Sequence, residues 1–166
     1  MFTKKDLETF CKKLKNGHVV AAPAEGVYGY CADPFNVDAL EKLLAIKNRT
    51  AGKGFITLIK DWEDLPQLVR PLSVAEKTTL EAHWPGQVTV VLPAAEGLLP
   101  LLTGGRETIA VRMPKADTMQ DYLHAWGAPL ISTSANLSGQ PPATTTADLF
   151  EGIFALESKT PLKGGV

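Results

Sequence analysis

Apolar residues at helical spacing occur near the start of the chain. Leu7, Phe10, Cys11 and Leu14 recur every three or four positions, with a threonine before them and a glycine after them. This spacing buries one side of a helix, and a hydroxyl side chain and a glycine are common start and stop signals. The pattern therefore predicts an amphipathic helix over residues 4–15.

Three further stretches carry helix signals. One begins after Asn36 and ends in the polar stretch 47–53, one runs from Ser73 to about His83, and one covers residues 117–126. Asparagine and serine are preferred N-cap residues, and a glutamate three residues after the serine has the spacing of a capping box. We expect a helix in each of these stretches.

Short apolar runs bounded by turn-forming residues lie between the predicted helices. Runs of four to eight residues with β-branched side chains and Gly, Pro or Asn at their ends are typical of strands. Strands are therefore predicted at residues 18–22, 55–59, 87–93, 108–112 and 129–133.

The alternation of short strands with helices indicates the fold class. It favours an α/β protein over an all-β barrel. A chain of 166 residues has the length of one domain, and the sequence contains no internal repeat or interdomain linker. We expect residues 1–166 to form a single domain with a twisted mixed β-sheet flanked by helices.

Composition and charge exclude several classes of protein. Hydrophobic residues at 45% and charged residues at 21% are ordinary for a globular protein and exclude a disordered or coiled-coil chain. The net charge of -1 gives no overall attraction to nucleic acid or to a membrane. The charged start and the lack of a long apolar run predict a cytoplasmic protein without a membrane span. Cys11 and Cys31 are expected to be buried free thiols.

Several familiar catalytic signatures are missing from the sequence. It has no Gly-x-x-x-x-Gly-Lys loop, no Gly-x-Gly-x-x-Gly and no group of Cys and His at metal-ligand spacing, so no metal ligand is predicted. The lack of a Gly-x-Ser-x-Gly motif disfavours covalent acyl catalysis. Positioning and electrostatics remain as the chemistry available to this chain.

Positive charge is concentrated in one stretch. Residues 42–60 contain five basic side chains and no acidic one. One interpretation is a solvated helix end, because lysine near a helix C-terminus complements the helix dipole. The other is phosphate binding, in which Arg49 grips two oxygens and Lys47 acts as a point charge. Glycines on both sides of Lys53 would then let the backbone approach a ligand.

Hydroxyl side chains are concentrated in a second stretch. Residues 127–147 contain seven of them and no charged residue. Turn-forming loops account for such a composition. Alternatively, Ser132, Thr133 and Ser134 leave a buried strand end together, which is where α/β sheets place ligands. Together with Asn136, these neutral donors suit phosphate or ribose oxygens.

Five motifs follow one another in an order that is typical of one family. They are residues 23–29, Lys47-x-Arg49 with Lys53, residues 84–86, residues 108–114, and residues 132–136 with Ser134-x-Asn136. Because the ordered set spans residues 18–146, the chain resembles the YrdC/TsaC family in its short, single-domain bacterial form. The resemblance implies a YrdC-like fold and a threonylcarbamoyl-AMP synthase. Such an enzyme combines L-threonine, bicarbonate and ATP into threonylcarbamoyl-AMP and pyrophosphate, for modification of the adenosine beside the tRNA anticodon.

The resemblance also implies roles for individual residues. Lys47 and Arg49 would be catalytic, stabilising charge on phosphoryl oxygens and on pyrophosphate, with Mg²⁺ bound together with the nucleotide. Arg112 would contact the threonine carboxylate and Tyr28 would line the amino-acid pocket. The alternation along strand 108–112 points Arg112 away from its apolar neighbours and towards a cleft. The residues implied in ATP binding are Lys47, Arg49, Lys53, Thr108, Ser132, Ser134 and Asn136.

Two positions depart from the family pattern. Ala24 stands where the family commonly has threonine, so one hydroxyl contact to substrate is missing. Leu58 stands where many longer relatives carry a histidine that reaches threonine. Family members also continue past Val166, so by this resemblance the chain is expected to be either trimmed or natively short, in a form that lacks one nucleotide-side strand or lid of the family.

Two other functions stay open. A non-catalytic module for tRNA or double-stranded RNA, such as a ribosome-assembly factor, would place the same basic residues on a phosphate backbone. The near-neutral charge and the lack of interleaved aromatic residues argue against it. A carbamoyl-adenylate enzyme of metallocofactor maturation is the other, although such relatives are usually embedded in larger proteins. For the synthase, the implied partners are L-threonine, bicarbonate, ATP and a downstream tRNA threonylcarbamoyl transferase complex, with no membrane and with direct tRNA binding left open.

Overall fold

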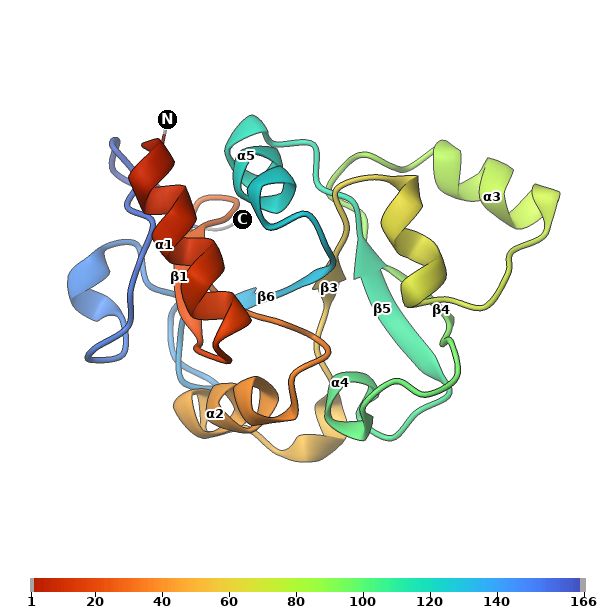
Figure 1. Cartoon of the computed structure of the whole chain (residues 1–166), viewed down its shortest axis with the longest axis horizontal. Coiled ribbons are helices and arrows are strands. Elements are labelled where there is room, and N and C mark those ends of the chain that lie inside the picture. Colours follow the sequence, from red (N-terminus) through yellow and green to blue (C-terminus); the bar gives the residue numbers. More distant parts are fainter. Residues whose placement is uncertain (1, 165–166) are drawn as a thin grey trace.

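The computed structural model describes residues 2–164, and its helices and strands are shown in Figure 1. The α-helices are α1 (Lys4–Lys15), α2 (Val37–Lys47), α3 (Val74–Glu81), α4 (Pro100–Thr103) and α5 (Asp117–Trp126). The strands are β1 (Val20–Pro23), β2 (Tyr28–Ala32), β3 (Thr57–Leu58), β4 (Val90–Pro93), β5 (Thr108–Arg112) and β6 (Leu130–Ser134). Short 3₁₀ helices are η1 (Ala51–Lys53), η2 (Trp62–Gln67) and η3 (Thr146–Asp148).

The strands form one mixed six-stranded sheet in the order β1-β2-β6-β3-β5-β4. The pair β3–β5 is parallel and the other neighbouring pairs are antiparallel. Strand β6, which is last in the sequence, therefore lies between β2 and β3 in the middle of the sheet. The predicted mixed α/β fold is confirmed.

The helix boundaries follow the capping residues read from the sequence. The side chain of Asn36 accepts a hydrogen bond from Ala39 N at the start of α2. At α3, Ser73 Oγ accepts from Glu76 N while Glu76 Oε1 accepts from Ser73 N, so the predicted capping box is present. These short-range bonds satisfy backbone N–H groups that have no partner inside the helix.

The predicted strand at 87–93 begins only at Val90, and β2 was not among the predicted strands. Two other predicted strands also differ from the observed ones. The run at 55–59 gives only two strand residues, because Phe55 N donates to Leu102 O of α4 instead of to a neighbouring strand. The run at 18–22 begins later, since His18 N still donates to Lys13 O and closes the end of α1. In both cases a contact with a helix outcompetes sheet pairing.

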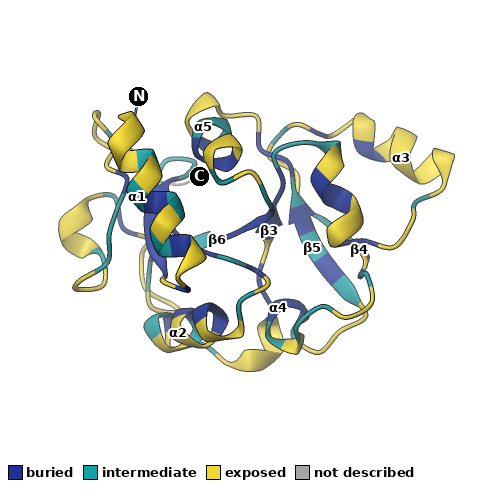
Figure 2. Ribbon diagram, in the orientation of Figure 1, coloured by how far each residue is buried: buried dark blue, intermediate teal, exposed yellow. Residues whose placement is uncertain are grey.

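Helices cover both faces of the sheet (Figure 2). On one face α1 and α5 bury Phe10, Leu14 and Tyr122, and on the other face α2 buries Leu40 and Leu43. Of the two cysteines, Cys31 is buried and Cys11 is only partly buried, and both are free. No helix within residues 2–164 combines the length and the apolar character needed to cross a membrane.

Within residues 2–164, no helix covers the part of the sheet around Val91, which is exposed. Strand register aligns Arg112 with Leu58, and Leu58 with Leu130, so all three side chains point to the face that carries α5. On that same face, Val91 of the edge strand pairs with Ala110 and is 63% exposed. The face is therefore buried under α5 near β6 and open towards β5 and β4.

Candidate active site

Two clefts that share Ile56 lie on this open part of the sheet. The first, which we name the Arg112 cleft, has a volume of about 330 Å³. The second, the Arg49 cleft, has a volume of about 290 Å³. The Arg112 cleft includes Glu25, Tyr28, Leu58, Arg112, Ser132 and Ser134, and the Arg49 cleft includes Arg49, Lys53, Arg106 and Thr108.

Lys47 is the last residue of α2 and its side chain is directed to the end of β6. Its Nζ lies 2.6 Å from Ser134 O and 2.5 Å from Asn136 Oδ1. The helix ends there because Asn48 adopts the left-handed conformation at φ 50°, and Lys47 O accepts from Ser138 N. Backbone and side-chain bonds together thus hold the Lys47 ammonium against the loop that follows β6.

The Lys47 ammonium has an unusual electrostatic environment. The residue is only 3% exposed, and within residues 2–164 no carboxylate forms an ion pair with it. Burial, with a smaller contribution from the positive charge of Arg49, lowers the pKa of Lys47 to about 8. A cation held by neutral oxygens keeps its full charge available for an anionic ligand.

Ser134 and Asn136 are positioned by a short hydrogen-bond chain. Ser134 Oγ donates to Asn136 Oδ1 at 2.8 Å, and Asn136 Nδ2 donates to Gln140 O at 2.5 Å. The amide oxygen of Asn136 therefore faces Lys47. The structure brings the Lys-x-Arg and Ser-x-Asn motifs together, as the resemblance led us to expect.

Arg49 lies at the entrance of the second cleft. Its Nη2 donates to Gly54 O at 2.7 Å, and its guanidinium carbon lies 4.9 Å from the centre of the Phe55 ring. Its Nε is buried and has no hydrogen-bond partner among the described residues. Since buried polar atoms in native proteins are nearly always paired, this unpaired N–H makes Arg49 a candidate for contact with a ligand oxygen.

Gly54 has a structural reason of its own, and the expected approach of a ligand to the backbone at Gly52 and Gly54 stays a prediction. Gly54 has φ 65°, and a Cβ there would lie 2.8 Å from Leu102 O, which belongs to α4. At Gly52 a Cβ would meet no atom within 4 Å. The close approach at Gly54 is thus between two backbone segments of the protein, which lets η1 pack on α4, and it leaves no need for a ligand to explain the glycine.

Arg112 points out of the core, as its strand position predicts. Ile109 and Val111 are buried, and Arg112 lines its cleft with Nη2 2.5 Å from Oε1 of Glu25. Its Nε, like that of Arg49, is buried and unpaired among the described residues. Glu25 was not singled out by the sequence analysis, although it lies inside the first of the five motifs.

The remaining predicted residues divide between the clefts. Thr108 and Lys53 line the Arg49 cleft, and Ser132 lines the Arg112 cleft. Tyr28 also belongs to the lining of the Arg112 cleft, but its hydroxyl accepts from Ser158 N at 3.0 Å and is engaged with the C-terminal segment. Thr133 lies between Ser132 and Ser134 in β6 and pairs with Tyr30, so its side chain points to the opposite face of the sheet. The three hydroxyls therefore do not share one face.

Arg106, a cation, is a second residue that sequence reasoning missed. It lines the Arg49 cleft, and its Nη1 donates to Lys53 O at 3.2 Å. The sequence offered no signal for it, because Arg106 lies outside both the basic stretch 42–60 and the five motifs. Only the packing of η1 against α4 brings Arg106 next to the basic stretch.

Comparisons with known proteins agree with this arrangement. The Sua5_yciO_yrdC family model, described as telomere recombination, matches residues 12–158. The threonylcarbamoyl-AMP synthase of Idiomarina loihiensis is 42% identical over 138 residues, which is 82% of this chain and 74% of that protein. The threonylcarbamoyl-AMP synthase of Photobacterium profundum is 40% identical over 146 residues, which is 87% of this chain and 79% of that protein.

A solved structure, P. abyssi Sua5 complexed with L-threonine, superposes with a TM-score of 0.81 at 31% identity. The match covers 90% of this chain and 45% of the P. abyssi chain, so this chain spans less than half of that protein. The family model, by contrast, matches most of the present sequence. The chain therefore belongs to the Sua5/YciO/YrdC family.

Proposed function

We propose that this chain is a threonylcarbamoyl-AMP synthase, which converts ATP, L-threonine and bicarbonate into threonylcarbamoyl-AMP and pyrophosphate. The observation that carries the proposal is the buried Lys47 ammonium, held by Ser134 and Asn136 without a carboxylate partner among the described residues. Relatives named threonylcarbamoyl-AMP synthase and a related structure with L-threonine support it.

The chemistry needs cations more than it needs a nucleophile. The carbamate of threonine attacks the α-phosphorus of ATP, and negative charge grows on the phosphoryl oxygens and on the departing pyrophosphate. Lys47 and Arg49 are the groups that would stabilise this charge. Arg49 lines its cleft and Lys47 contacts Ser134 of the other cleft, and neither forms an ion pair with a carboxylate among the described residues. Lys53 and Thr108 would contact the nucleotide from the Arg49 cleft, and Ser132 and Ser134 from the Arg112 cleft. Asn136, which contacts Lys47 and Ser134 but lines neither cleft, would bind the nucleotide beside Ser134.

The amino acid would occupy the Arg112 cleft. The partly exposed guanidinium of Arg112 lines this cleft and can bind a carboxylate, and Leu58, Met119 and Ala24 give an apolar wall for the methyl group of threonine. The side chains of Ala24 and Leu58 cannot form a hydrogen bond with the hydroxyl of threonine. Ser132 or a water molecule would form that bond instead.

Burial of Lys47 also argues against the RNA-binding alternative. Proteins that follow a phosphate backbone use exposed Lys and Arg side chains. An ammonium that is 3% exposed suits a small anion that enters a cleft. Direct binding of tRNA is therefore not part of this proposal.

Magnesium belongs to the proposal as part of the nucleotide substrate, bound to its phosphate oxygens. Within residues 2–164 no three His, Cys, Asp or Glu side chains come together as a metal site. The product is an activated carbamoyl group, which a tRNA threonylcarbamoyl transferase complex would consume. The proposal places the reaction in the cytoplasm.

Pyrophosphate release tests the proposal. Purified protein with Mg·ATP should release pyrophosphate only when both L-threonine and bicarbonate are present, because the carbamate is the attacking group. Omitting either one should reduce the signal to the background of protein with ATP alone. ATP turnover that is indifferent to threonine would contradict the proposal.

A further inference from the structure

One ion pair crosses the Arg112 cleft. Oε1 of Glu25 lies 2.5 Å from Nη2 of Arg112, and each side chain is 22% exposed. Glu25 belongs to the loop between β1 and β2, whereas Arg112 ends β5, and both β6 and β3 lie between β2 and β5. With neighbouring strands ~4.8 Å apart, the pair bridges roughly 14 Å of sheet above the floor of the cleft.

The loop that carries Glu25 is held by contacts other than this ion pair. Ala24 N donates to Val27 O, and the next residue, Tyr28, donates its N–H to Ala143 O, both at 2.8 Å. Gly26 has φ 80°, which the turn requires, and its carbonyl accepts from Gly164 N. The loop thus has backbone contacts that do not depend on the pair between Glu25 and Arg112.

The ion pair leaves Arg112 free to exchange partners. A partly exposed pair contributes little to stability, so the carboxylate of a ligand can compete with Glu25 for the guanidinium. The buried Nε of Arg112 has no partner among the described residues, so an unused donor remains beside the pair. Two oxygens of a ligand carboxylate match such a planar fork of N–H groups.

Charge in the described lining of this cleft is limited to these two residues. Glu25 is its one carboxylate and Arg112 its one cation, while the others are apolar or hydroxyl-bearing. A zwitterionic α-amino acid carries one cation and one anion on the same carbon. Such a ligand exchanges the Glu25–Arg112 pair for two new pairs and leaves no charge unbalanced in the cleft.

We infer that Glu25 binds the α-ammonium group of the amino-acid substrate, beside the contact of Arg112 with its carboxylate. Glu25 is then a specificity residue that selects an amino acid over a simple carboxylic acid. The inference rests on the proposed function, because it states how the threonine of that reaction is recognised.

Glu25 also acquires a role once the carbamate forms. The nitrogen of threonine bonds to the carbon of bicarbonate and the C–OH bond breaks. Of the two protons that the ammonium loses, one leaves with the hydroxide as water and one goes to solvent. The group facing Glu25 thereby changes from a cation to an anion. Repulsion from Glu25 then directs the carbamate away from the loop and towards the cations Lys47 and Arg49.

The test measures binding of three probes by isothermal titration calorimetry. They are L-threonine, 3-hydroxybutanoate, which lacks the amino group, and L-threonine methyl ester, which lacks the free carboxylate. The proteins are wild type, Glu25→Gln, Glu25→Asp and Glu151→Gln, the last an exposed glutamate outside both clefts. A thermal unfolding scan of each variant verifies its fold, and Glu25→Ala replaces Glu25→Gln in the comparison if that variant is unfolded.

Glu25→Gln should reduce the preference for L-threonine over 3-hydroxybutanoate by roughly 10–100-fold, the worth of one charge-assisted contact. Binding of 3-hydroxybutanoate should be unchanged or tighter, because Arg112 loses a competing carboxylate. The preference for L-threonine over its methyl ester should persist, since that depends on Arg112. Glu25→Asp should keep most of the wild-type preference, and Glu151→Gln all of it.

Two outcomes would overturn the inference separately from the proposed function. If Glu25→Gln keeps the wild-type preference, or binds L-threonine more tightly, Glu25 is only a counter-ion of Arg112. In that case wild type still releases pyrophosphate with threonine and the proposed function stands. If wild type neither binds L-threonine nor releases pyrophosphate with it, the proposed function is wrong and the inference is wrong with it.

Discussion

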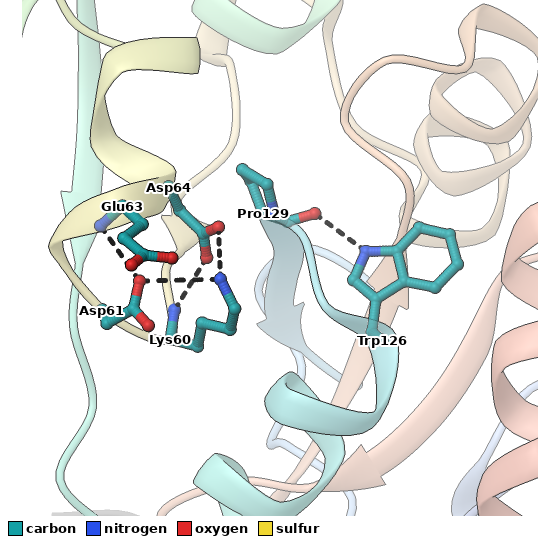
Figure 3. A network of polar contacts seen from close by, with 6 residues as sticks. All are labelled: Lys60, Asp61, Glu63, Asp64, Trp126 and Pro129. Carbon is teal, nitrogen blue, oxygen red and sulfur yellow. Dashed lines mark hydrogen bonds and ion pairs between the residues drawn. The ribbon is translucent and has the colours of Figure 1, made fainter.

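Lys47 and Lys60 come from the same basic stretch, and both ammonium groups are largely withdrawn from water, yet their partners differ in kind. Lys47 meets neutral oxygens of Ser134 and Asn136. Lys60 meets carboxylates, with Nζ 2.7 Å from Asp64 and 3.5 Å from Asp61 (Figure 3). The backbone N–H of Lys60 also donates to the second carboxylate oxygen of Asp64, and the side chain of Asp64 is almost fully buried.

The two environments shift the lysine pKa values in opposite directions. Burial lowers the pKa of Lys47 to about 8, while the hydrogen bond and charge of Asp64 raise the pKa of Lys60. A paired lysine ties β3 to η2 and has no charge left for a ligand. An unpaired one costs free energy in the folded state and keeps its charge for a ligand. Two lysines that carry the same charge in the sequence thus become a structural residue, Lys60, and a functional residue, Lys47.

The largest expected effect is on catalysis. Lys47→Ala should lower the turnover of pyrophosphate release by at least about 10²-fold, the loss associated with one transition-state donor. Lys60→Ala is the matched control and should stay within a few-fold of wild type when assayed well below its unfolding temperature. Steady-state rates with saturating ATP, threonine and bicarbonate measure both. Equal losses in the two variants would remove the distinction between the lysines.

For stability we expect the opposite order, in which loss of the Lys60 ion pair costs more than loss of the Lys47 side chain. Asp64→Ala should lower the free energy of unfolding by about 2–3 kcal/mol, below the full cost of breaking a buried pair because Lys60 can still reach water. For a chain of this size that corresponds to a fall of roughly 5–10 °C in Tm. Urea unfolding of Asp64→Ala and Lys47→Ala side by side checks it. Lys47→Ala should be the more stable of the two variants.

The pH dependence should separate the lysines again. Because the Lys47 ammonium must be charged to hold phosphate, kcat/KM for ATP should fall above pH 8, by about tenfold per unit. In the same range the free energy of unfolding of wild type, relative to Lys47→Ala, should rise with pH. The unfolded chain, with an ordinary lysine pKa of 10.5, binds the proton that folded Lys47 has released. A kcat/KM profile that is flat to pH 9.5 would contradict the assigned role of Lys47.

The smallest effect concerns Arg49. Arg49→Lys keeps the charge but loses the fork that donates to Gly54 O and stacks on Phe55, so turnover should fall by about tenfold. The turnover numbers of Arg49→Lys and Arg49→Ala, measured with saturating substrates, separate the effect of the charge from the effect of the guanidinium shape. If Arg49→Lys is as active as wild type, Arg49 acts as a general cation and resembles Lys47 more closely.

Local features of this protein could be predicted from the sequence because they depend on residues a few positions apart. The caps at Asn36 and Ser73, the bounds of α1, β5 and α5, and the outward direction of Arg112 follow from side-chain chemistry and from alternation within one element. Motif order added the family and thereby the expectation that Lys47 and Asn136 serve one nucleotide site, which composition and spacing alone could not supply.

The tertiary structure decided which charges are neutralised. Lys47 meets Ser134, and Arg112 meets Glu25, across 87 positions of sequence in each case. These contacts exist because β6 is inserted between β2 and β3, an order fixed by burial of both sheet faces and by no local preference. The partner of Lys60 is only four residues away, but Asp64 binds it because η2 turns the carboxylate back onto the end of β3. Charge counts alone cannot separate these lysines, because their pKa values depend on burial and on partners that folding brings close.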